Sequence, residues 1–524
     1  MSEVLEQENK RLRECLQKSN SQAEHFEREW YLRGDEIERM EALCDEMFAT
    51  MTLCIDAYAS LQRSLSIAGK SHKRNPAQMD SERHRMSNYN PYPAYKDSGV
   101  EWIGQVPEHW GVKPIKIVTT YNDDVLPESI SADALIEYVE ISAVKYADGI
   151  VSTEKMPFGN APSRARRTAK LGDVVISSVR TYLKAVAAVD ESHADCVFST
   201  GFVILRAKKG RVAPEFLKWL ALNELLIQAV ESHSEGLSYP AINAPELVNL
   251  KTVIPPLQEQ SAIASALDRE TTRIDTLITK KTRFIELLKE KRQALITHAV
   301  TKGLDPNVKM KNSGVEWIGE VPEHWRVCSL GYVTRASTGG TPDRKVDSYW
   351  NGSIPWAKTG EIRYETITKT EEFITPDGLT NSAAFVAEPG TILMAMYGMG
   401  VTRGRVAMLG IPAAFNQACA AISCNVGVHN WYVYYCLYSA YRFIRDLGNE
   451  ASQINLNLEI ISKIKIPVPP LNLQMEIAER LVAQLTKLDA IESKAQKTID
   501  LLKERRSAFI TAAVTGQIDL RGAA

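Results

Sequence analysis

Hydrophobic side chains recur every three or four residues along two long stretches of the chain. One stretch follows residues 254–257 (Ile-Pro-Pro-Leu), and the other follows residues 468–471 (Val-Pro-Pro-Leu). A proline pair stops a preceding strand and favours the start of a helix. Each stretch runs for about 40 residues, which predicts a helix about 60 Å long. The predicted seams are Ile263, Leu267, Ile274, Leu277, Phe284, Leu288 and Leu295 in the first helix, and Ile477, Leu481, Leu488, Ile491, Leu502 and Phe509 in the second.

Polar residues interrupt both seams. Glu270 and Lys281 interrupt the first, and Gln484 and Arg505 interrupt the second. Polar residues at seam positions fix register and partner choice in coiled coils. We therefore expect the two helices to pair with each other in antiparallel orientation and to hold two globular domains at a set distance.

A third seam lies near the N-terminus. Its positions alternate in steps of three and four, and they are Ile37, Met40, Cys44, Met47, Met51, Cys54, Tyr58, Leu61 and Leu65. This spacing predicts a coiled-coil helix, and the polar residues 66–85 predict a flexible linker. Two interpretations stay open. Residues 1–85 are an added helix for oligomerisation or partner binding, or Met86 is the working start of the protein.

The chain also repeats itself. Residues 96–110 return as residues 311–325 with 13 of 15 positions identical, and residues 287–301 return in similar form as residues 501–515. So long a period indicates a duplicated domain followed by a duplicated helix, not a solenoid. Two similar halves in one chain can present a pseudo-twofold face, and duplex DNA has twofold symmetry of its own.

The interiors of the repeats, residues 111–253 and 326–467, mix strands with helices. The β-branched residues at 173–179, 202–205 and 390–397 predict strands, and residues 214–220 and 429–435 predict helices. The expected fold class is α+β, with two tandem globular domains separated by long paired helices and preceded by a helical extension. The expected segments are 1–85 (extension and linker), 86–255 (first domain), 256–308 (first spacer helix), 309–469 (second domain) and 470–524 (second spacer helix).

Composition indicates an ordinary globular protein. Apolar residues make up 44% and charged residues 24% of the chain. The sequence has no apolar run of the roughly 18 residues that a membrane span needs, and its acidic N-terminus is unlike a secretory signal, so we expect a cytoplasmic protein. Eight cysteines without a CxxC pair argue against a disulfide framework and against a zinc site. The net charge of −2 conceals a basic stretch at residues 151–211, with 11 Lys/Arg against 5 Asp/Glu.

Catalytic motifs are missing from the sequence. It contains no GxxxxGK[ST] phosphate loop, GxSxG elbow or HExxH zinc motif. His109 and His324 each follow a glutamate in the repeated segment, and such a pair can do acid–base work. We favour the alternative that these residues form a turn that docks the following tryptophan, because no nucleophile lies nearby in the sequence.

Two basic clusters at matching places in the repeats favour nucleic-acid binding. Arginine suits bidentate contacts to guanine, and both arginine and lysine bind phosphates. The candidate DNA-binding residues of the first half are Arg164, Arg166, Arg167, Lys170, Arg180, Tyr182 and Lys184. Those of the second half are Tyr397, Arg403 and Arg405, which follow a glycine-containing turn. A solvated basic face is the alternative for either cluster taken alone.

The chain resembles the specificity subunits of type I restriction–modification systems over about residues 90–520. The resemblance rests on the paired Gly-Val-Glu-Trp-Ile-Gly-x-Val-Pro-Glu-His-Trp segments, on residues 254–260, and on the helix endings at 299–303 and 513–517. Motifs at residues 337–342, 354–356, 414–417 and 453–456 resemble those of a target-recognition domain. Thr341, within the first of these motifs, and Lys358, two residues after the second, are also candidate DNA-binding residues.

The resemblance implies that the chain is a non-catalytic DNA-recognition subunit. Each target-recognition domain would read one half of a bipartite site, while the paired helices set the spacer and dock methyltransferase subunits. A motor-nuclease subunit would join for restriction. S-adenosylmethionine, ATP and Mg²⁺ would be held by these partners, with no cofactor on this chain. Residues 1–85 have no counterpart in the family's usual plan.

Three alternatives stay open from the sequence. The first is a single-chain restriction–methylation enzyme, the second is a coiled-coil interaction protein, and the third is an orphan specificity subunit without active partners. Purified protein that methylates DNA by itself would favour the first. DNA binding that is absent or insensitive to salt would favour the second.

Overall fold

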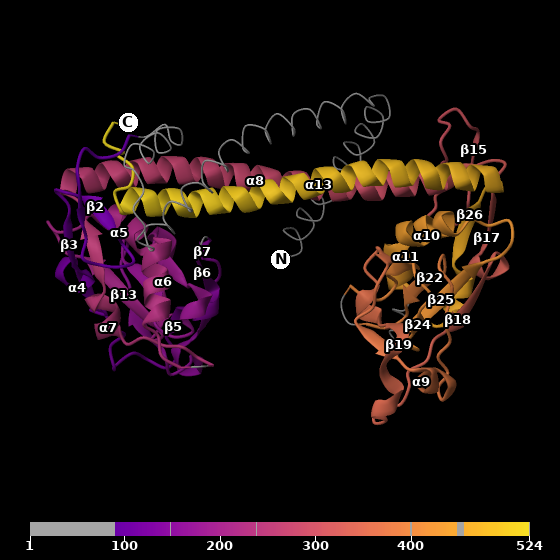
Figure 1. The fold of residues 1–524 in the computed structure, drawn as a ribbon, viewed down its shortest axis with the longest axis horizontal. Helices are drawn as coiled ribbons and strands as arrows, with labels where there is room; N and C mark the ends of the chain where they lie inside the picture. The colour runs from indigo at the N-terminus through magenta and orange to yellow at the C-terminus, as the bar shows by residue number, and fades with distance from the viewer. Residues whose placement is uncertain (1–89, 147, 237, 399–400, 448–454, 523–524) are drawn as a thin grey trace, which may run out of the picture. The chain divides into compact units, whose positions relative to one another are not determined.

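The computed structural model describes residues 90–522, apart from positions 147, 237, 399–400 and 448–454 (Figure 1). The seam predicted between Ile37 and Leu65 and the linker at 66–85 lie outside the described residues. The chain divides into two compact units. Of the described residues, unit 1 holds those within 90–282 and 495–522, and unit 2 holds those within 283–494. No helix in the described part of the chain is both long and apolar enough to cross a membrane.

Unit 1 contains two four-stranded sheets. The antiparallel sheet has the order β11-β10-β13-β4, and the mixed sheet has the order β8-β5-β12-β9 with β5 and β12 parallel. The strands of these sheets are β4 (Thr119–Tyr121), β5 (Leu135–Val139), β8 (Glu154–Pro157), β9 (Ala165–Thr168), β10 (Val174–Ser177), β11 (Val186–Ala188), β12 (Val197–Ser199) and β13 (Phe202–Ala207). Smaller pairs are β1 (Tyr95–Asp97) with β2 (Gln105–Pro107), β3 (Gly111–Pro114) with β14 (Lys251–Ile254), and β6 (Val144–Lys145) with β7 (Gly149–Ile150). The short helices are α4 (Ile115–Val118), α5 (Pro214–Ala221), α6 (Glu224–Ser232) and α7 (Ala244–Asn249).

Unit 2 contains a five-stranded and a three-stranded sheet. Their orders are β18-β25-β22-β23-β20 and β21-β19-β24, and β19 and β24 are parallel. The strands are β18 (Thr334–Thr338), β19 (Trp350–Ala357), β20 (Thr366–Ile367), β21 (Glu372–Ile374), β22 (Ile392–Ala395), β23 (Val406–Leu409), β24 (Ala414–Phe415) and β25 (Cys419–Cys424). The smaller pairs are β15 (Met310–Asn312) with β16 (Glu320–Pro322) and β17 (Arg326–Ser329) with β26 (Lys465–Val468). The short helices are α9 (Pro376–Thr380), α10 (Asn430–Ser439), α11 (Tyr441–Asp446) and α12 (Leu458–Lys463).

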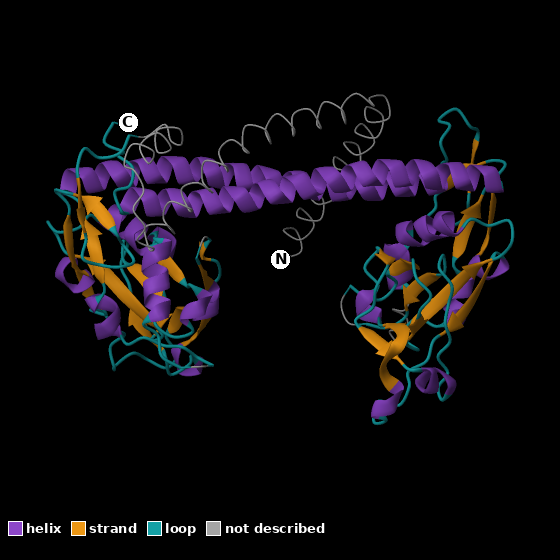
Figure 2. Cartoon of the chain, viewed as in Figure 1, coloured by secondary structure: helices purple, strands orange, loops and turns teal. Residues whose placement is uncertain are grey.

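The same topology therefore occurs in both units. The order β4-β13-β10-β11 recurs as β18-β25-β22-β23, and β8-β5-β12 recurs as β21-β19-β24, with its parallel pair in the same place. The strands predicted at 173–179, 202–205 and 390–397 are β10, β13 and β22, and the predicted helices are α5 and α10. The α+β class and the tandem repeat are confirmed (Figure 2).

The two long helices, α8 (Leu257–Thr301) and α13 (Leu471–Val514), each contribute one part to each unit. Their buried faces follow the repeat. The buried seam of α8 includes Ile263, Leu267, Thr271, Ile274, Ile285, Leu288 and Ile296, and that of α13 includes Ile477, Leu481, Leu485, Leu488, Ile499, Leu502 and Ile510. Each of these α13 residues lies 214 positions after its α8 equivalent. Among the other predicted pairing residues, Ile491 is buried and Leu277 is half-buried.

The seam differs from the prediction by one position in several turns. Phe284, Leu295 and Phe509 are half-buried, whereas the residue after each of them is buried. Likewise Arg506, not Arg505, lies in the buried face, and so does Thr271 instead of Glu270. Two successive four-residue steps, at 263, 267 and 271, move the buried face along the helix. A straight helix of 3.6 residues per turn drifts in this way against a strict 3.5-residue repeat.

Ion pairs fix the antiparallel register of α8 and α13. In unit 1, Arg506 Nε lies 3.0 Å from Asp275 Oδ1. In unit 2, Arg292 pairs with Asp489, and Lys289 Nζ lies 3.7 Å from Glu492 Oε1. A step of three residues forward along α8 is thus matched by a step of three back along α13. Arg292 and Asp275 are the repeat equivalents of Arg506 and Asp489, so one interaction is made once in each unit.

A buried glutamine joins the start of each long helix to the neighbouring domain. Gln260 Oε1 accepts from the backbone N–H of Ala213, the residue before α5, at 2.8 Å, and its Nε2 donates to the Pro255 carbonyl at 2.8 Å. Gln474 repeats these contacts with the N–H of His429, before α10, and with the Pro469 carbonyl. The side-chain amide thereby satisfies both a helix N-terminus and a proline carbonyl that would otherwise be buried without partners.

Two repeated tryptophans dock against the ends of the long helices. In unit 1, Trp110 is fully buried and lies against Gly516, just after α13; in unit 2, Trp325 lies against Gly303, just after α8. Both glycines have positive φ, 74° and 81°, and a Cβ on either would come within 3.0 Å of the indole ring. Only glycine suits a left-handed helix end that approaches a ring so closely.

We expect Gln260→Ala to lower the free energy of unfolding of unit 1 by about 1–3 kcal/mol, because it leaves a buried N–H and a buried carbonyl unsatisfied. Urea unfolding followed by intrinsic fluorescence measures this loss. Gln258→Ala is the matched control, since Gln258 is exposed on the same turn of α8 and should change stability by less than about 0.5 kcal/mol. Equal losses in both variants would contradict the buried-glutamine account.

Candidate nucleic-acid interface

In unit 1, the connection between β10 and β11 carries three of the predicted DNA-binding residues. Arg180 and Lys184 flank a short turn at Thr181–Leu183, and both have left-handed backbones, with φ of 51° and 50°. Such backbones cost about 1–3 kcal/mol for residues other than glycine, and they gather at functional sites. Tyr182, inside the turn, is 52% exposed. The fold therefore holds this connection in a conformation that the chain alone would not favour.

A second loop lies beside this connection. The N–H of Ile242 donates to the Ser178 carbonyl at 2.8 Å, which ties residues 238–242 to the strand end. The Arg180 guanidinium lies 5.1 Å from the ring centre of Tyr239, which is 65% exposed. We call residues 178–185 and 238–242 the loop pair of unit 1. It presents two cations, Arg180 and Lys184, and the exposed rings of Tyr182 and Tyr239.

Unit 2 has an equivalent loop pair, made of residues 396–398 and 401–405 between β22 and β23 and of residues 455–456. The N–H of Leu456 donates to the Met396 carbonyl at 3.0 Å, as Ile242 does to Ser178 in unit 1. Tyr397 is 38% exposed. Arg405 lies 5.8 Å from the ring of Tyr364, whereas Arg403 is buried and donates to the Arg445 carbonyl. The structure thus places Arg180, Tyr182 and Lys184 of the first half and the three predicted residues of the second half on equivalent connections, but Arg403 supports the loop instead of facing solvent.

The basic run at 164–170 is largely paired with groups that the sequence pattern did not indicate. Arg164 lies 2.6 Å from Glu140, Lys170 lies 3.2 Å from Asp124, and Lys184 of the neighbouring loop lies 2.6 Å from Glu224. Arg167 is half-buried and donates to Asn122 and to the Phe202 carbonyl, so its role is structural. Arg166 stacks on Phe158 at 4.8 Å. Within the described residues, Arg166, Arg167 and Arg180 are the cations of this set without a carboxylate partner, and of these Arg167 is held by Asn122 and the Phe202 carbonyl.

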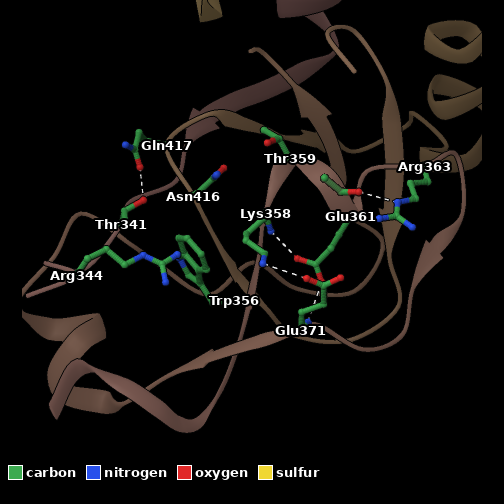
Figure 3. A pocket seen from close by; sticks show the side chains of 11 residues that line it. Thr341, Arg344, Trp356, Lys358, Thr359, Glu361, Arg363, Glu371, Asn416 and Gln417 are labelled. Carbon is green, nitrogen blue, oxygen red and sulfur yellow. Dashed lines mark hydrogen bonds and ion pairs between the residues drawn. The ribbon is translucent and has the colours of Figure 1, made fainter. Parts of the chain in front are cut away.

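A polar pocket of about 430 Å³ lies in unit 2, where the parallel strands β19 and β24 end (Figure 3). Two predicted residues, Thr341 and Lys358, line it. Trp356 comes from β19, and Asn416 and Gln417 directly follow β24. Carboxyl ends of parallel strands often border ligand sites, because the loops that follow them converge there. Thr341 and Lys358 were predicted from the sequence as separate candidates, and the fold places both in one pocket.

Charged side chains on one wall of this pocket are tightly paired. Lys358 Nζ lies 2.9 Å from Glu372 Oε1 and 3.0 Å from Glu371 Oε2, and these contacts raise the pKa of Lys358. Arg344 pairs with Glu372 and stacks on Trp350 and Trp356 at 3.8 and 5.0 Å. Burial opposes ionisation of Glu372, but Lys358 and Arg344 outweigh it and hold the pKa of this carboxyl below its ordinary value.

Comparisons with known proteins place this fold. Residues 322–501 match the family model described as type I restriction modification DNA specificity domain. The putative type I restriction enzyme MjaX specificity subunit of Methanocaldococcus jannaschii is 24% identical over 429 residues, which cover 80% of this chain and 96% of that protein. The MjaVIII specificity subunit of the same organism is 26% identical over 311 residues, or 56% of this chain and 68% of that protein.

A solved structure shares the fold as well. It comes from a study of complex assembly and conformational transition of the type I restriction–modification system, has a TM-score of 0.63 and 21% identity, and covers 79% of this chain and 99% of that one. Residues 322–501 thus carry a type I restriction–modification DNA specificity domain, and most of the chain is similar to a type I specificity subunit. The predicted resemblance is confirmed, and with it the role of a non-catalytic specificity subunit.

The repeated histidine of the specificity subunit has a structural setting in unit 1. His109 Nε2 lies 2.7 Å from Glu259 Oε1, and Trp110 Nε1 donates to Glu259 Oε2 at 3.0 Å. Glu259, not the adjacent Glu108, is therefore its partner. The Tyr92 hydroxyl also contacts Glu259, and burial raises the pKa of this phenol. The cluster attaches the tryptophan turn to the first turn of α8, which agrees with the docking interpretation.

Several residues of the candidate interface escaped the sequence prediction. Arg344, Trp356 and Asn416 line the pocket, and Tyr239 completes the loop pair of unit 1. Asn416 and Trp356 stood in motifs that carried the family resemblance, so a signal existed for them. Nothing in the local sequence indicated Arg344 or Tyr239, because their roles depend on loops that meet only in the folded domain.

Glu372→Gln should destabilise unit 2 by about 1 kcal/mol at neutral pH, because it removes the carboxylate that Lys358 and Arg344 share. A carboxyl with a depressed folded pKa stabilises fully above its unfolded value, ordinarily 4.5, and loses this effect as pH falls through the folded value. The stability difference between the variant and the wild type should therefore be constant above about pH 5 and shrink toward pH 3. Unfolding curves measured across this range provide the test. Glu388→Gln, an exposed change in the same unit, is the control, and a difference that does not vary with pH would contradict the pairing.

Proposed function

We propose that each unit of this specificity subunit reads one half of a bipartite DNA site. The observation that carries the proposal is the loop pair, which recurs in both units with the same backbone tie, and each loop pair carries an exposed tyrosine and an arginine that lies over a tyrosine ring. Phosphate contacts by Arg and Lys supply affinity, and contacts to base edges supply sequence discrimination. In unit 1, Arg166 and Arg180 are available for such contacts, and Tyr182 and Tyr239 offer flat apolar surfaces.

The paired cations contribute to the proposal as well. Arg164 and Lys170 lie in ion pairs whose basic side chains are 55% and 68% exposed. Exposed ion pairs contribute only about 0–1 kcal/mol. A phosphate can therefore replace the carboxylate at small cost, so Arg164, Lys170 and Lys184 stay in the proposed interface. Arg167 and Arg403 are assigned a supporting role.

We propose that the partners of the chain are methyltransferase subunits and motor-nuclease subunits. In this arrangement S-adenosylmethionine is held by the modification subunit, and ATP and Mg²⁺ are held by the motor subunit. The sequence contains no phosphate loop and no methyltransferase motif pair, which supports a division of labour among subunits. The exposed faces of α8 and α13 are the proposed docking surface, and the same helices set the spacer between the half-sites.

Adenine methylation mapping tests the reading function. A host that expresses this chain with its methyltransferase should methylate a bipartite motif, and the motif should vanish when the gene for this chain is deleted. A host that keeps the methyltransferase alone is the matched control. An unchanged methylome would reject the proposal and favour an orphan subunit or a coiled-coil interaction protein.

The spacer function predicts the effect of lengthening both helices together. Seven residues inserted within 276–288 and seven within 493–505 keep the Asp275–Arg506 and Arg292–Asp489 pairs in register. Each helix gains about 10 Å, which corresponds to about three base pairs of B-DNA. The mapped motif should gain spacer length while both half-sites stay the same. An insertion into α8 alone is the control, since it breaks the register and should abolish methylation. Altered half-sites with an unchanged spacer would contradict this role.

A further inference from the structure

The pocket of unit 2 contains an amide whose hydrogen-bonding capacity is unused. Asn416 Oδ1 is shielded from solvent and accepts no hydrogen bond from any described residue, although the side chain lines the pocket. An unsatisfied buried oxygen costs about 1–3 kcal/mol, and in native proteins it calls for an explanation. A donor that enters the pocket would remove this cost.

A second amide lies beside the first. The Thr341 hydroxyl donates to Gln417 Oε1, which fixes the orientation of this amide, and Gln417 Nε2 has no partner among the described residues (Figure 3). Gln417 is exposed, so this donor is accessible from the pocket mouth. Asn416 and Gln417 are consecutive and follow a strand whose register with β19 fixes their backbone. The pair therefore presents an acceptor and donors from a rigid support.

Two of the three cations that line the pocket are paired with carboxylates, and the third, Arg363, donates to the Gly360 carbonyl at 2.7 Å. Lys358 is held between Glu371 and Glu372, and Arg344 is held by Glu372 and two indole rings. Arginine and lysine are the side chains that recognise guanine, whereas asparagine and glutamine make a bidentate contact to N6 and N7 of adenine. Lys358 and Arg344 are neutralised, whereas Asn416 Oδ1 is unpaired and Gln417 keeps a free donor, so the side of the pocket that these amides form is suited to adenine.

We propose that Asn416 and Gln417 read the major-groove edge of an adenine in the half-site that unit 2 recognises. This inference rests on the proposed function and assigns one base to one site. The adenine N6 amino group would donate to Asn416 Oδ1, and N7 would accept from an amide N–H of the pair. Thr341 is a positioning residue, because it acts through Gln417.

The equivalent place in unit 1 has different chemistry. The parallel registers of β5 with β12 and of β19 with β24 make Glu140 the counterpart of Lys358, and Ser199 the counterpart of Asn416. Ser199 is buried and its hydroxyl accepts from the N–H of Gly201 at 3.3 Å. Unit 1 therefore has no unpaired amide at this position, and the amide reading is specific to unit 2.

The test is the methylated motif of full-length variants expressed with the methyltransferase. Asn416→Asp turns the amide into an acceptor only, which cannot donate to adenine N7. We expect discrimination at one A·T position of one half-site to fall roughly 5- to 150-fold, with the other half-site unchanged. Gln417→Glu changes an exposed residue and keeps the acceptor for Thr341. It provides the same test if Asn416→Asp lowers the melting temperature.

The control and the outcomes separate this inference from the proposed function. Asn307→Asp makes the same chemical change at an exposed position of unit 2 outside the long helices and the pocket, and it should leave the motif unchanged. If the wild type yields no bipartite motif, the proposed function fails. If the wild type yields one but both pocket variants leave every position unchanged, the amide reading is overturned. It is also overturned if the affected position is a G·C pair.

Discussion

The antiparallel register of α8 and α13 is the constraint on which both units depend, because neither unit completes its core from consecutive residues. In unit 1, Ile510, Ala513 and Val514 at the end of α13 belong to the same buried cluster as Trp110 and Trp219. In unit 2, the Tyr432 hydroxyl of α10 donates to the Val300 carbonyl at the end of α8. A parallel pairing would remove both sets of contacts. Long helices are stabilised mainly by the apolar face that they bury, so the register and the two cores support each other.

Repeated polar contacts give the register its precision. Thr511 of α13 donates to Asn223 beside α6 in unit 1, and Thr297 of α8 bonds to Ser439 at the end of α10 in unit 2. Thr297 and Thr511 are repeat equivalents, as are Gln260 and Gln474 at the opposite helix ends. Apolar packing tolerates sliding by one turn better than these contacts do, because each leaves a buried polar group unsatisfied when it is displaced. Each unit thus lies between the start of one long helix and the end of the other, held by the same groups.

The sequence predicted the fold class, the repeat and the long helices because these depend on periodicity, which is local and occurs twice. It located the buried face less well, since Phe284 and Ile285 are both apolar and only the cumulative drift of the helix decides between them. The sequence failed most clearly to predict which carboxylates pair with the basic side chains. The run at 164–170 reads as free cations, yet Glu140 and Asp124 come from segments 24 to 46 residues away. Residue type alone also cannot predict that Arg403 is buried and donates to a backbone carbonyl, whereas Arg180 stacks on an exposed aromatic ring.

The positions at which the two units differ show which contacts the duplicated framework does not require. Their framework contacts are conserved between the halves, but Glu259 in unit 1 corresponds to Leu473 in unit 2. Trp110 has a carboxylate partner for its indole N–H, whereas Trp325 has none among the described residues. Unit 1 also binds the last described residues of the chain, since Arg521 lies over Tyr92 and pairs with Asp519. The end of α13 lies in unit 1, so the described segment that follows α13 packs only against that unit. The additional carboxylate of unit 1, Glu259, therefore follows from the antiparallel register. The difference between Glu140 and Lys358 has no such cause in the framework, because these residues directly follow equivalent strands, β5 and β19, in the same topology. Such a difference is expected if the two units recognise DNA half-sites of different sequence, as proposed above.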